Sequence, residues 1–229
     1  IEDLIPNEEM VLMITQDGYI KRMPLDTYKQ QRRGGLGLMG METKEEDVVT
    51  DLFVSMTHDS VLFFTNLGKM YSLKAWQVPV GSRQSKGKPI VNLLPKLEEG
   101  ERIMATRPIT KMAGEHYLVF ATRAGIVKKT PLAAYANVSS RGLIALGLDE
   151  GDKLVDVKLT DGSKEIILAT KKGLAVRFDE AQVRPMGRPA RGVIGIRPEE
   201  GDEVVSMAIV DGGSALLTVT ENGYGKISM

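Results

Sequence analysis

A short stretch rich in arginine and glycine has the residue types that bind phosphate. It reads Gln31-Arg32-Arg33-Gly34-Gly35-Leu36-Gly37, and we call it the box. An arginine guanidinium presents a planar fork of donors that matches phosphate oxygens. Glycine has no Cβ, so it lets another backbone come close. The box therefore predicts an exposed loop along a nucleic-acid backbone, although a flexible turn with solvated arginines contains the same residue types.

Few other residues could perform catalysis or hold a metal. The 229-residue chain has no cysteine and two histidines, His58 and His116, which do not occupy equivalent positions in the pattern described below. An enzyme site would need acids or histidines that converge, so we expect no catalytic residue, metal or cofactor. No apolar run is long enough to span a membrane, and no signal segment opens the chain. We therefore expect a cytoplasmic protein without a membrane partner.

A pattern with a period of about 50 residues organises the chain. Five apolar runs end in a threonine, and each threonine precedes a glycine by three positions, at Gly18, Gly68, Gly125, Gly173 and Gly223. Short β-branched runs bounded by turn residues predict strands, and each glycine predicts a tight hairpin. The five threonines, at 15, 65, 122, 170 and 220, should therefore occupy equivalent positions.

Each repeat contains enough further signals for four strands, which is one blade of a propeller. A second strand follows the hairpin, and a loop with a basic-glycine pair comes next. Third strands are expected over 36–41, 89–94, 143–148 and 193–196, and last strands from 48, 103, 154 and 204. Single helical turns are expected at 24–28 and 131–135. The prediction is one all-β domain over 1–229, with repeats over 11–60, 61–117, 118–165 and 166–214 and a partial one over 215–229.

Charge follows the same repeat. The chain has 30 basic and 30 acidic residues, which alone argues against a nucleic-acid partner. The basic residues recur on the second strand and its loop, whereas acidic residues recur in the turn before the last strand. We therefore expect the basic sites on one surface and the acidic turns on another, a distribution that favours duplex DNA as a partner.

These residues resemble a known family, the C-terminal domain of DNA gyrase A and of its topoisomerase IV counterpart. The box matches six of the seven positions of the family sequence Q-R-R-G-G-K-G, with Leu36 in place of the usual basic residue. Supporting matches span nearly the whole chain, at 18–25, 63–69, 90–94, 184–188 and 221–226. The last three resemble gyrase more than topoisomerase IV.

The resemblance implies a β-pinwheel, a propeller-like disc whose blades exchange strands, with duplex DNA wrapped around its basic rim. It implies a non-catalytic domain of an ATP-dependent type II topoisomerase that acts with the rest of gyrase A and with gyrase B in an A2B2 enzyme. The strand-cleaving tyrosine would lie outside this chain. The family usually has six repeats, whereas this sequence shows four complete ones and the start of a fifth.

The resemblance also suggests which residues contact DNA. In the box they are Gln31, Arg32, Arg33, Gly34, Gly35 and Gly37. Along the rim they are Lys21, Arg22, Lys69, Lys86, Lys128, Lys129, Arg141, Lys171, Lys172, Arg177, Arg188 and Arg191. The alternatives are a topoisomerase IV domain that binds DNA for decatenation, a propeller that binds protein through an exposed apolar patch, and a propeller enzyme with a central site.

Overall fold

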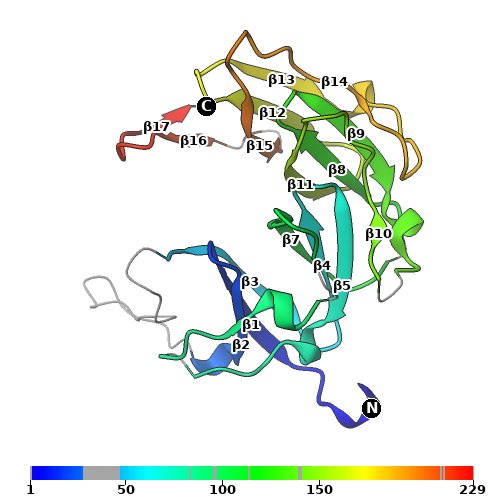
Figure 1. The fold of residues 1–229 in the computed structure, drawn as a ribbon, viewed down its shortest axis with the longest axis vertical. Helices are drawn as coiled ribbons and strands as arrows, with labels where there is room; N and C mark the ends of the chain where they lie inside the picture. Colours follow the sequence, from blue (N-terminus) through cyan, green and yellow to red (C-terminus); the bar gives the residue numbers. More distant parts are fainter. Residues whose placement is uncertain are drawn as a thin grey trace. The chain divides into compact units, whose positions relative to one another are not determined.

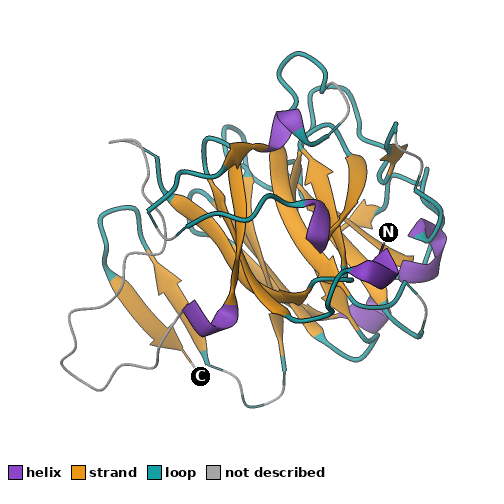
Figure 2. Ribbon diagram, turned by 90° about the horizontal axis from the view of Figure 1, so that it is seen from below, coloured by secondary structure: helices purple, strands orange, loops and turns teal. Residues whose placement is uncertain are grey.

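The computed structural model is built from antiparallel β-sheets (Figure 1). It describes residues 2–27, 47–82, 84–94, 97–112, 114–138, 141–211, 213 and 215–228. Helical segments in these ranges are single 3-10 turns, coloured purple in Figure 2: η1 (Glu2–Leu4), η2 (Leu25–Thr27), η3 (Ala75–Gln77), η4 (Ile90–Asn92), η5 (Leu132–Tyr135) and η6 (Glu180–Gln182). The predicted turns at 24–28 and 131–135 are thus confirmed by η2 and η5, and the box lies outside the described residues.

The chain divides into two compact units. The first, Ile1–Met112 with Tyr135–Ala145, contains two four-stranded sheets. Their strand orders are β3 (Val49–Met56), β1 (Glu9–Thr15), β2 (Tyr19–Pro24), β6 (Lys88–Pro89), and β7 (Ile103–Ile109), β4 (Ser60–Thr65), β5 (Lys69–Lys74), β10 (Leu143–Ile144).

The second unit, Ala113–Ala134 with Leu146–Met229, contains the remaining sheets. A four-stranded sheet has the order β11 (Leu154–Thr160), β8 (Tyr117–Thr122), β9 (Ile126–Pro131), β14 (Val193–Ile194). A three-stranded sheet has the order β15 (Val204–Val210), β12 (Glu165–Thr170), β13 (Ala175–Asp179), and β16 (Leu216–Val219) pairs with β17 (Gly225–Ser228). Among the described residues, no helix is long and apolar enough to cross a bilayer.

Three sheets are completed by a strand from the following repeat. β6 pairs with β2, β10 pairs with β5, and β14 pairs with β9. In each case the first two strands of the sheet form a hairpin, and the exchanged strand comes from about 70 residues further along the chain. This exchange confirms the expected all-β fold of the β-pinwheel type.

The exchanged strands are two residues long, shorter than the third strands predicted from the sequence. One end of each exchanged strand is set by the hairpin at which its partner strand begins. Each exchanged strand runs antiparallel to the second strand of the preceding repeat and meets the start of that strand at the hairpin glycine. Its last pairing is a backbone N–H donated to that glycine's carbonyl, as from Ile90 to Gly18 at 2.8 Å and from Ala145 to Gly68 at 2.8 Å. Beyond the glycine the partner strand turns away, so the ladder ends.

The repeated threonines occupy equivalent positions, as predicted. Each carbonyl accepts the N–H of the hairpin glycine at 2.9–3.0 Å, and each glycine has a φ between 75° and 92°. Each hydroxyl accepts the N–H four residues later at 3.0–3.3 Å, in Thr15, Thr65, Thr122, Thr170 and Thr220. The side chain thus satisfies a donor that the tight turn leaves without a backbone partner.

Neighbouring sheets within each unit pack through apolar faces. In the first unit one cluster includes Leu12 of β1, Phe63 of β4 and Ile90 of η4. In the second unit another includes Val119 of β8 and Leu168 of β12. All five side chains are at most 1% exposed, so burial of apolar area holds successive sheets together.

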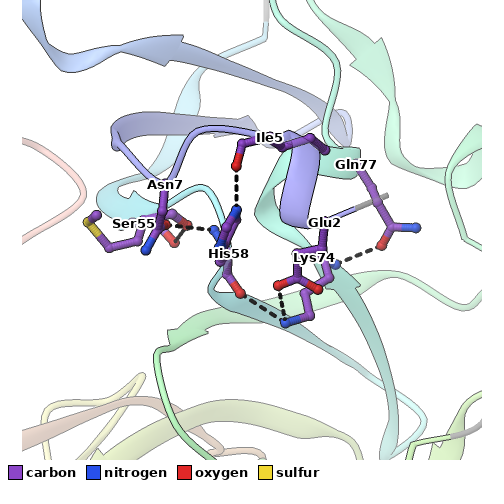
Figure 3. Close-up of polar contacts among 8 residues, drawn as sticks. Glu2, Ile5, Asn7, Ser55, His58, Lys74 and Gln77 are labelled. Carbon is purple, nitrogen blue, oxygen red and sulfur yellow. Dashed lines mark hydrogen bonds and ion pairs between the residues drawn. The ribbon is translucent and has the colours of Figure 1, made fainter.

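The N-terminal segment is fastened to the turn between β3 and β4 (Figure 3). His58 Nε2 lies 2.8 Å from the carbonyl of Ile5 and must carry the proton there, because a carbonyl only accepts. Asn7 Oδ1 accepts the backbone N–H of His58 at 3.2 Å, and Lys74 Nζ binds Glu2 at 3.0 Å. The buried Thr57 hydroxyl donates to the carbonyl of Pro6 at 2.7 Å and accepts the N–H of Glu8 at 2.7 Å.

We expect Thr57→Val to loosen this segment. Valine keeps the shape of the side chain but leaves the Glu8 N–H and the Pro6 carbonyl without their partner, at a cost of about 1–3 kcal/mol. Urea denaturation should show the loss, and limited proteolysis should cleave faster before residue 9. The matched control is Thr50→Val, because Thr50 is exposed and makes one long hydrogen bond of 3.4 Å. Equal effects of the two variants would contradict this assignment.

Candidate nucleic-acid interface

Three basic-glycine pairs have one geometry. Gly87, Gly142 and Gly192 each lie against the second strand of the preceding repeat. A Cβ on Gly87 would lie 2.5 Å from the carbonyl oxygen of Ile20, and a Cβ on Gly192 would lie 2.4 Å from that of Val127. These glycines also have positive φ, +79° at Gly87 and +110° at Gly192. Their smallness is therefore required by the protein's own backbone, which approaches them closely.

The basic residues before these glycines are exposed. Lys86, Arg141 and Arg191 are all surface side chains beside an exchanged strand. Arg191 forms an ion pair with Asp149 while its side chain stays 70% exposed. The repeat thus presents an exposed cation at the same place in three copies, and the contact of these residues with DNA stays a prediction. Lys88 on β6 is also exposed and was not among the predicted residues. Its position two residues after Lys86 could have indicated it from the sequence.

The cations near the hairpins lie beside the acidic turns. Lys69 pairs with Glu98, and the hydrogen bond that its ammonium donates to that carboxylate raises the pKa of Lys69. Lys172 Nζ donates to the carbonyl of Glu200 at 2.8 Å. Arg177 is different, because it pairs with Glu165 at the end of β12 that lies away from the hairpin. Lys171 is exposed and its backbone N–H donates to the Glu203 carbonyl.

The expected segregation of basic sites from acidic turns is therefore wrong at this edge. The first strand of a repeat ends at its hairpin, and the antiparallel last strand begins beside it, so the acidic turn and the hairpin are neighbours. Carboxylates of the acidic turn accept hairpin N–H groups at 2.9–3.0 Å: Asp47 from Asp17, Asp152 from Ala124, and Asp202 from Lys172. The acids cap the turns, and this role fixes where they lie.

Four predicted rim residues hold carbonyls of the protein itself. The side chains of Lys21 and Lys128 are fully buried, and Lys129 is 4% exposed. Lys21 Nζ donates to the carbonyls of Ser82 and Ser85 at 2.8 and 2.9 Å. Arg22 donates from Nε to the Val78 carbonyl at 2.6 Å.

The same pattern recurs in the second unit. Lys128 Nζ donates to the carbonyl of Arg188, and Lys129 Nζ donates to the carbonyl of Glu180 at 2.7 Å. Burial, with a smaller contribution from the charge of Arg188, lowers the pKa of Lys128 to about 8. Burial also lowers the pKa of Lys21. A phosphate could not reach these ammonium groups in this structure, and their role in DNA binding stays a prediction.

The remaining candidates are divided between the surface and the undescribed ranges. Arg188 is half-buried. The box residues lie outside the described residues, so their contacts with DNA stay a prediction. Within the described ranges, no group of histidine and acidic side chains is arranged to hold a metal ion.

Comparisons with known proteins agree with this architecture. The family model of the DNA gyrase C-terminal domain, a beta-propeller, matches residues 9–56, 59–110, 116–161, 164–211 and 214–228. The gyrase A protein of Halalkalibacterium halodurans is 49% identical over 189 residues, which cover 82% of this chain and 23% of that protein.

Solved structures give the same result. The C-terminal domain of DNA topoisomerase IV matches with a TM-score of 0.79 and 31% identity, over 98% of this chain and 68% of that one. A DNA gyrase A C-terminal domain matches with a TM-score of 0.75 and 29% identity, over 96% of this chain and 71% of that one.

The exchange of strands between successive repeats places the fold in one class, the propeller-like repeat domains whose blades share strands. The family match is specific within that class and extends over nearly all of the described strands. This chain belongs to the family of DNA gyrase C-terminal domains. It spans about 23% of the length of the curated gyrase A relative.

We expect Gly87→Ala to destabilise the protein more than Gly100→Ala. Both glycines have similar positive φ, +79° and +76°, which costs an alanine about 1–2 kcal/mol. A Cβ at Gly100 has open space, whereas one at Gly87 meets a backbone carbonyl and adds about 1–3 kcal/mol of overpacking. Urea denaturation of the two variants measures the difference. Equal losses would show that the exchanged strand tolerates a side chain there.

Proposed function

We propose that this domain binds duplex DNA without strong sequence preference and bends it along the exposed cations that precede the exchanged strands. The observation that carries the proposal is the repetition of an exposed cation before a fixed glycine, at Lys86, Arg141 and Arg191. Membership of the gyrase C-terminal domain family supports it. The box arginines, Arg32 and Arg33, continue the same loop position in the first repeat.

The physics of such binding is electrostatic. Each cation that neutralises a phosphate releases condensed counterions, and this release drives association. Contacts to phosphate position the duplex but carry little sequence information. Bending 20–30 base pairs costs roughly 1–6 kcal/mol, so contacts from several repeats must act together. Repetition of one cation per blade suits this requirement, because every blade presents the same contact to the next stretch of duplex.

The larger function follows from the parent protein. We propose that the domain acts in a cytoplasmic DNA gyrase of A2B2 composition, with the catalytic tyrosine in the remainder of gyrase A and ATP use in gyrase B. The wrap would direct strand passage toward negative supercoils. The structural match to a topoisomerase IV domain favours decatenation as the second candidate. The 49% identity to a gyrase A protein favours supercoiling over it.

We expect the affinity of this chain for duplex DNA to fall steeply with salt, by about 0.9 in log K per log unit of salt for each phosphate contacted. Single replacements Lys86→Ala, Arg141→Ala and Arg191→Ala should each reduce that slope by up to about 0.9. Fluorescence anisotropy at several salt concentrations measures it. Lys164→Ala is the control, because Lys164 pairs with Asp161 and Asp211 away from these loops. Binding that does not depend on salt would rule out the proposed function.

We expect the box to govern wrapping more than affinity. In the full enzyme, Arg32→Ala with Arg33→Ala should lower DNA affinity by about tenfold or less, because many similar contacts remain. Supercoiling should fall much further, since losing this anchor releases an arm of the bend. Relaxation and decatenation, which need no wrap, should largely survive.

The control for the box is a second double variant with the same loss of charge, Lys86→Ala with Arg191→Ala, assayed for binding, supercoiling and relaxation. It should match the box variant in affinity and keep more supercoiling. Equal losses in all three assays would show that the box is an ordinary part of the rim. Undisturbed supercoiling would show that the box is only a turn.

A further inference from the structure

Two consecutive basic residues on the second strand join one repeat to the next. They stand three and four positions after the hairpin glycine, as Lys21-Arg22 in the first repeat and Lys128-Lys129 in the third. In both copies the first residue binds carbonyls of the following repeat's basic loop. The second binds a carbonyl at the 3-10 turn just before that loop. The two copies lie in different units of the chain, so the arrangement occurs twice independently.

In the first unit, Lys21 closes the loop that ends in Lys86 and Gly87. Its ammonium donates to the carbonyls of Ser82 and Ser85. Its aliphatic stem lies so close to Gly81 that a Cβ there would be 2.9 Å from Cδ. Backbone bonds of 3.0 Å from Arg22 to Pro79 and from Gly81 to Arg22 fix the start of the same loop.

In the second unit, Lys128 holds the loop that contains Arg188 and Arg191. Its ammonium donates to the Arg188 carbonyl and lies 5.5 Å from the centre of the Phe120 ring. The start of the loop is again fixed by the neighbouring strand residue, because the N–H of Met186 donates to the carbonyl of Lys129 at 2.9 Å.

The second repeat shows how the joint is made without a lysine. Tyr71 and Ser72 stand at the same two positions. The buried Tyr71 ring lies against Gly142, where a Cβ would be 2.6 Å from a ring carbon. Its hydroxyl lies 3.4 Å from Glu101. An aromatic ring thus fills the place beside this loop glycine, whereas in the first copy a Cβ on Gly87 would meet the β-carbon of Lys21 at 3.2 Å.

We propose that Lys21 and Lys128 are positioning residues for the proposed DNA contacts: each holds the adjacent basic loop in shape through its carbonyls and does not itself contact phosphate. The part of this inference that concerns DNA rests on the proposed function. A buried ammonium needs hydrogen-bond partners. Loop carbonyls are among them, those of Ser82 and Ser85 for Lys21 and that of Arg188 for Lys128. In return, hydrogen bonds to a charged donor are stronger than neutral ones and offset the entropy lost on ordering a loop.

The proposal predicts a local effect that is visible without DNA. Lys21→Met keeps the length of the side chain and removes its donors. Hydrogen–deuterium exchange of the DNA-free chain should then speed up about tenfold or more at residues 81–87, with residues 186–192 unchanged. Lys128→Met should give the reverse pattern, so each variant is the control for the other. Lys86→Ala, which removes an exposed cation of the same loop, should leave exchange in both loops unchanged.

A glutamine variant separates positioning from charge. Lys21→Gln loses the charge and keeps an N–H donor, so it should recover much of the protection lost in Lys21→Met and much of the DNA affinity. A direct phosphate contact would instead make glutamine as harmful as methionine. If Lys21→Met does not fold, Lys128→Met and the glutamine variants at both sites carry the test. Unchanged exchange in both loops would overturn the proposal.

DNA binding then separates this inference from the proposed function. Lys21→Met combined with Lys86→Ala should weaken binding no more than about twofold beyond the stronger single variant, because both act through one loop. Fully additive losses would overturn the positioning role. If Lys86→Ala and Arg191→Ala leave DNA binding unchanged while the lysine variants alter hydrogen–deuterium exchange as expected, the proposed function is wrong. The role of Lys21 and Lys128 in holding the loops is then still supported.

Discussion

The structure depends on the pairing of each second strand with a strand from the next repeat. A hairpin has two free edges, and unpaired N–H and C=O groups at an edge invite wrong partners. The last strand of the same repeat covers one edge, and β6, β10 and β14 cover the other. No repeat among these can therefore complete its sheet alone. The loop before each exchanged strand must pack against the preceding hairpin. This packing requires glycine at 87 and 192 and places Lys21 and Lys128 beside the loop carbonyls.

The exchange also explains how a chain without net charge can carry exposed cations at repeated positions. Lys21 and Lys128 on the second strand donate to carbonyls of the next repeat's basic loop. The cations before the loop glycines, Lys86, Arg141 and Arg191, stay at the surface. Asp47, Asp152 and Asp202 cap hairpin N–H groups. Position along the repeat, rather than total charge, decides what each ionic group does.

Local features were predictable from sequence, and joints between repeats were not. The threonine-glycine hairpins depend on four neighbouring residues, so their spacing predicted the five equivalent turns. The third strands were predicted too long, because their ends are set by a glycine of the preceding repeat. Lys21 and Lys128 have the same residue type as exposed Lys86, and the sequence does not show the carbonyls that surround them. Antiparallel pairing of the first and last strands places the acidic turn beside the hairpin. The order of charges along the chain does not reveal this contact.

The surface ion pairs bear on how tightly such a domain could hold DNA. Arg191 is paired with Asp149 and Lys69 with Glu98, yet three of these four side chains are more than half exposed. An exposed ion pair contributes about 0–1 kcal/mol, so phosphate can replace the carboxylate at small cost. The buried pair of Lys129 and Glu180 is different, because removing a partner from a buried charge costs several kcal/mol. In the proposed function, the cations of the exposed pairs would exchange a carboxylate for a phosphate and back, while the buried pair of Lys129 and Glu180 joins the third repeat to the fourth.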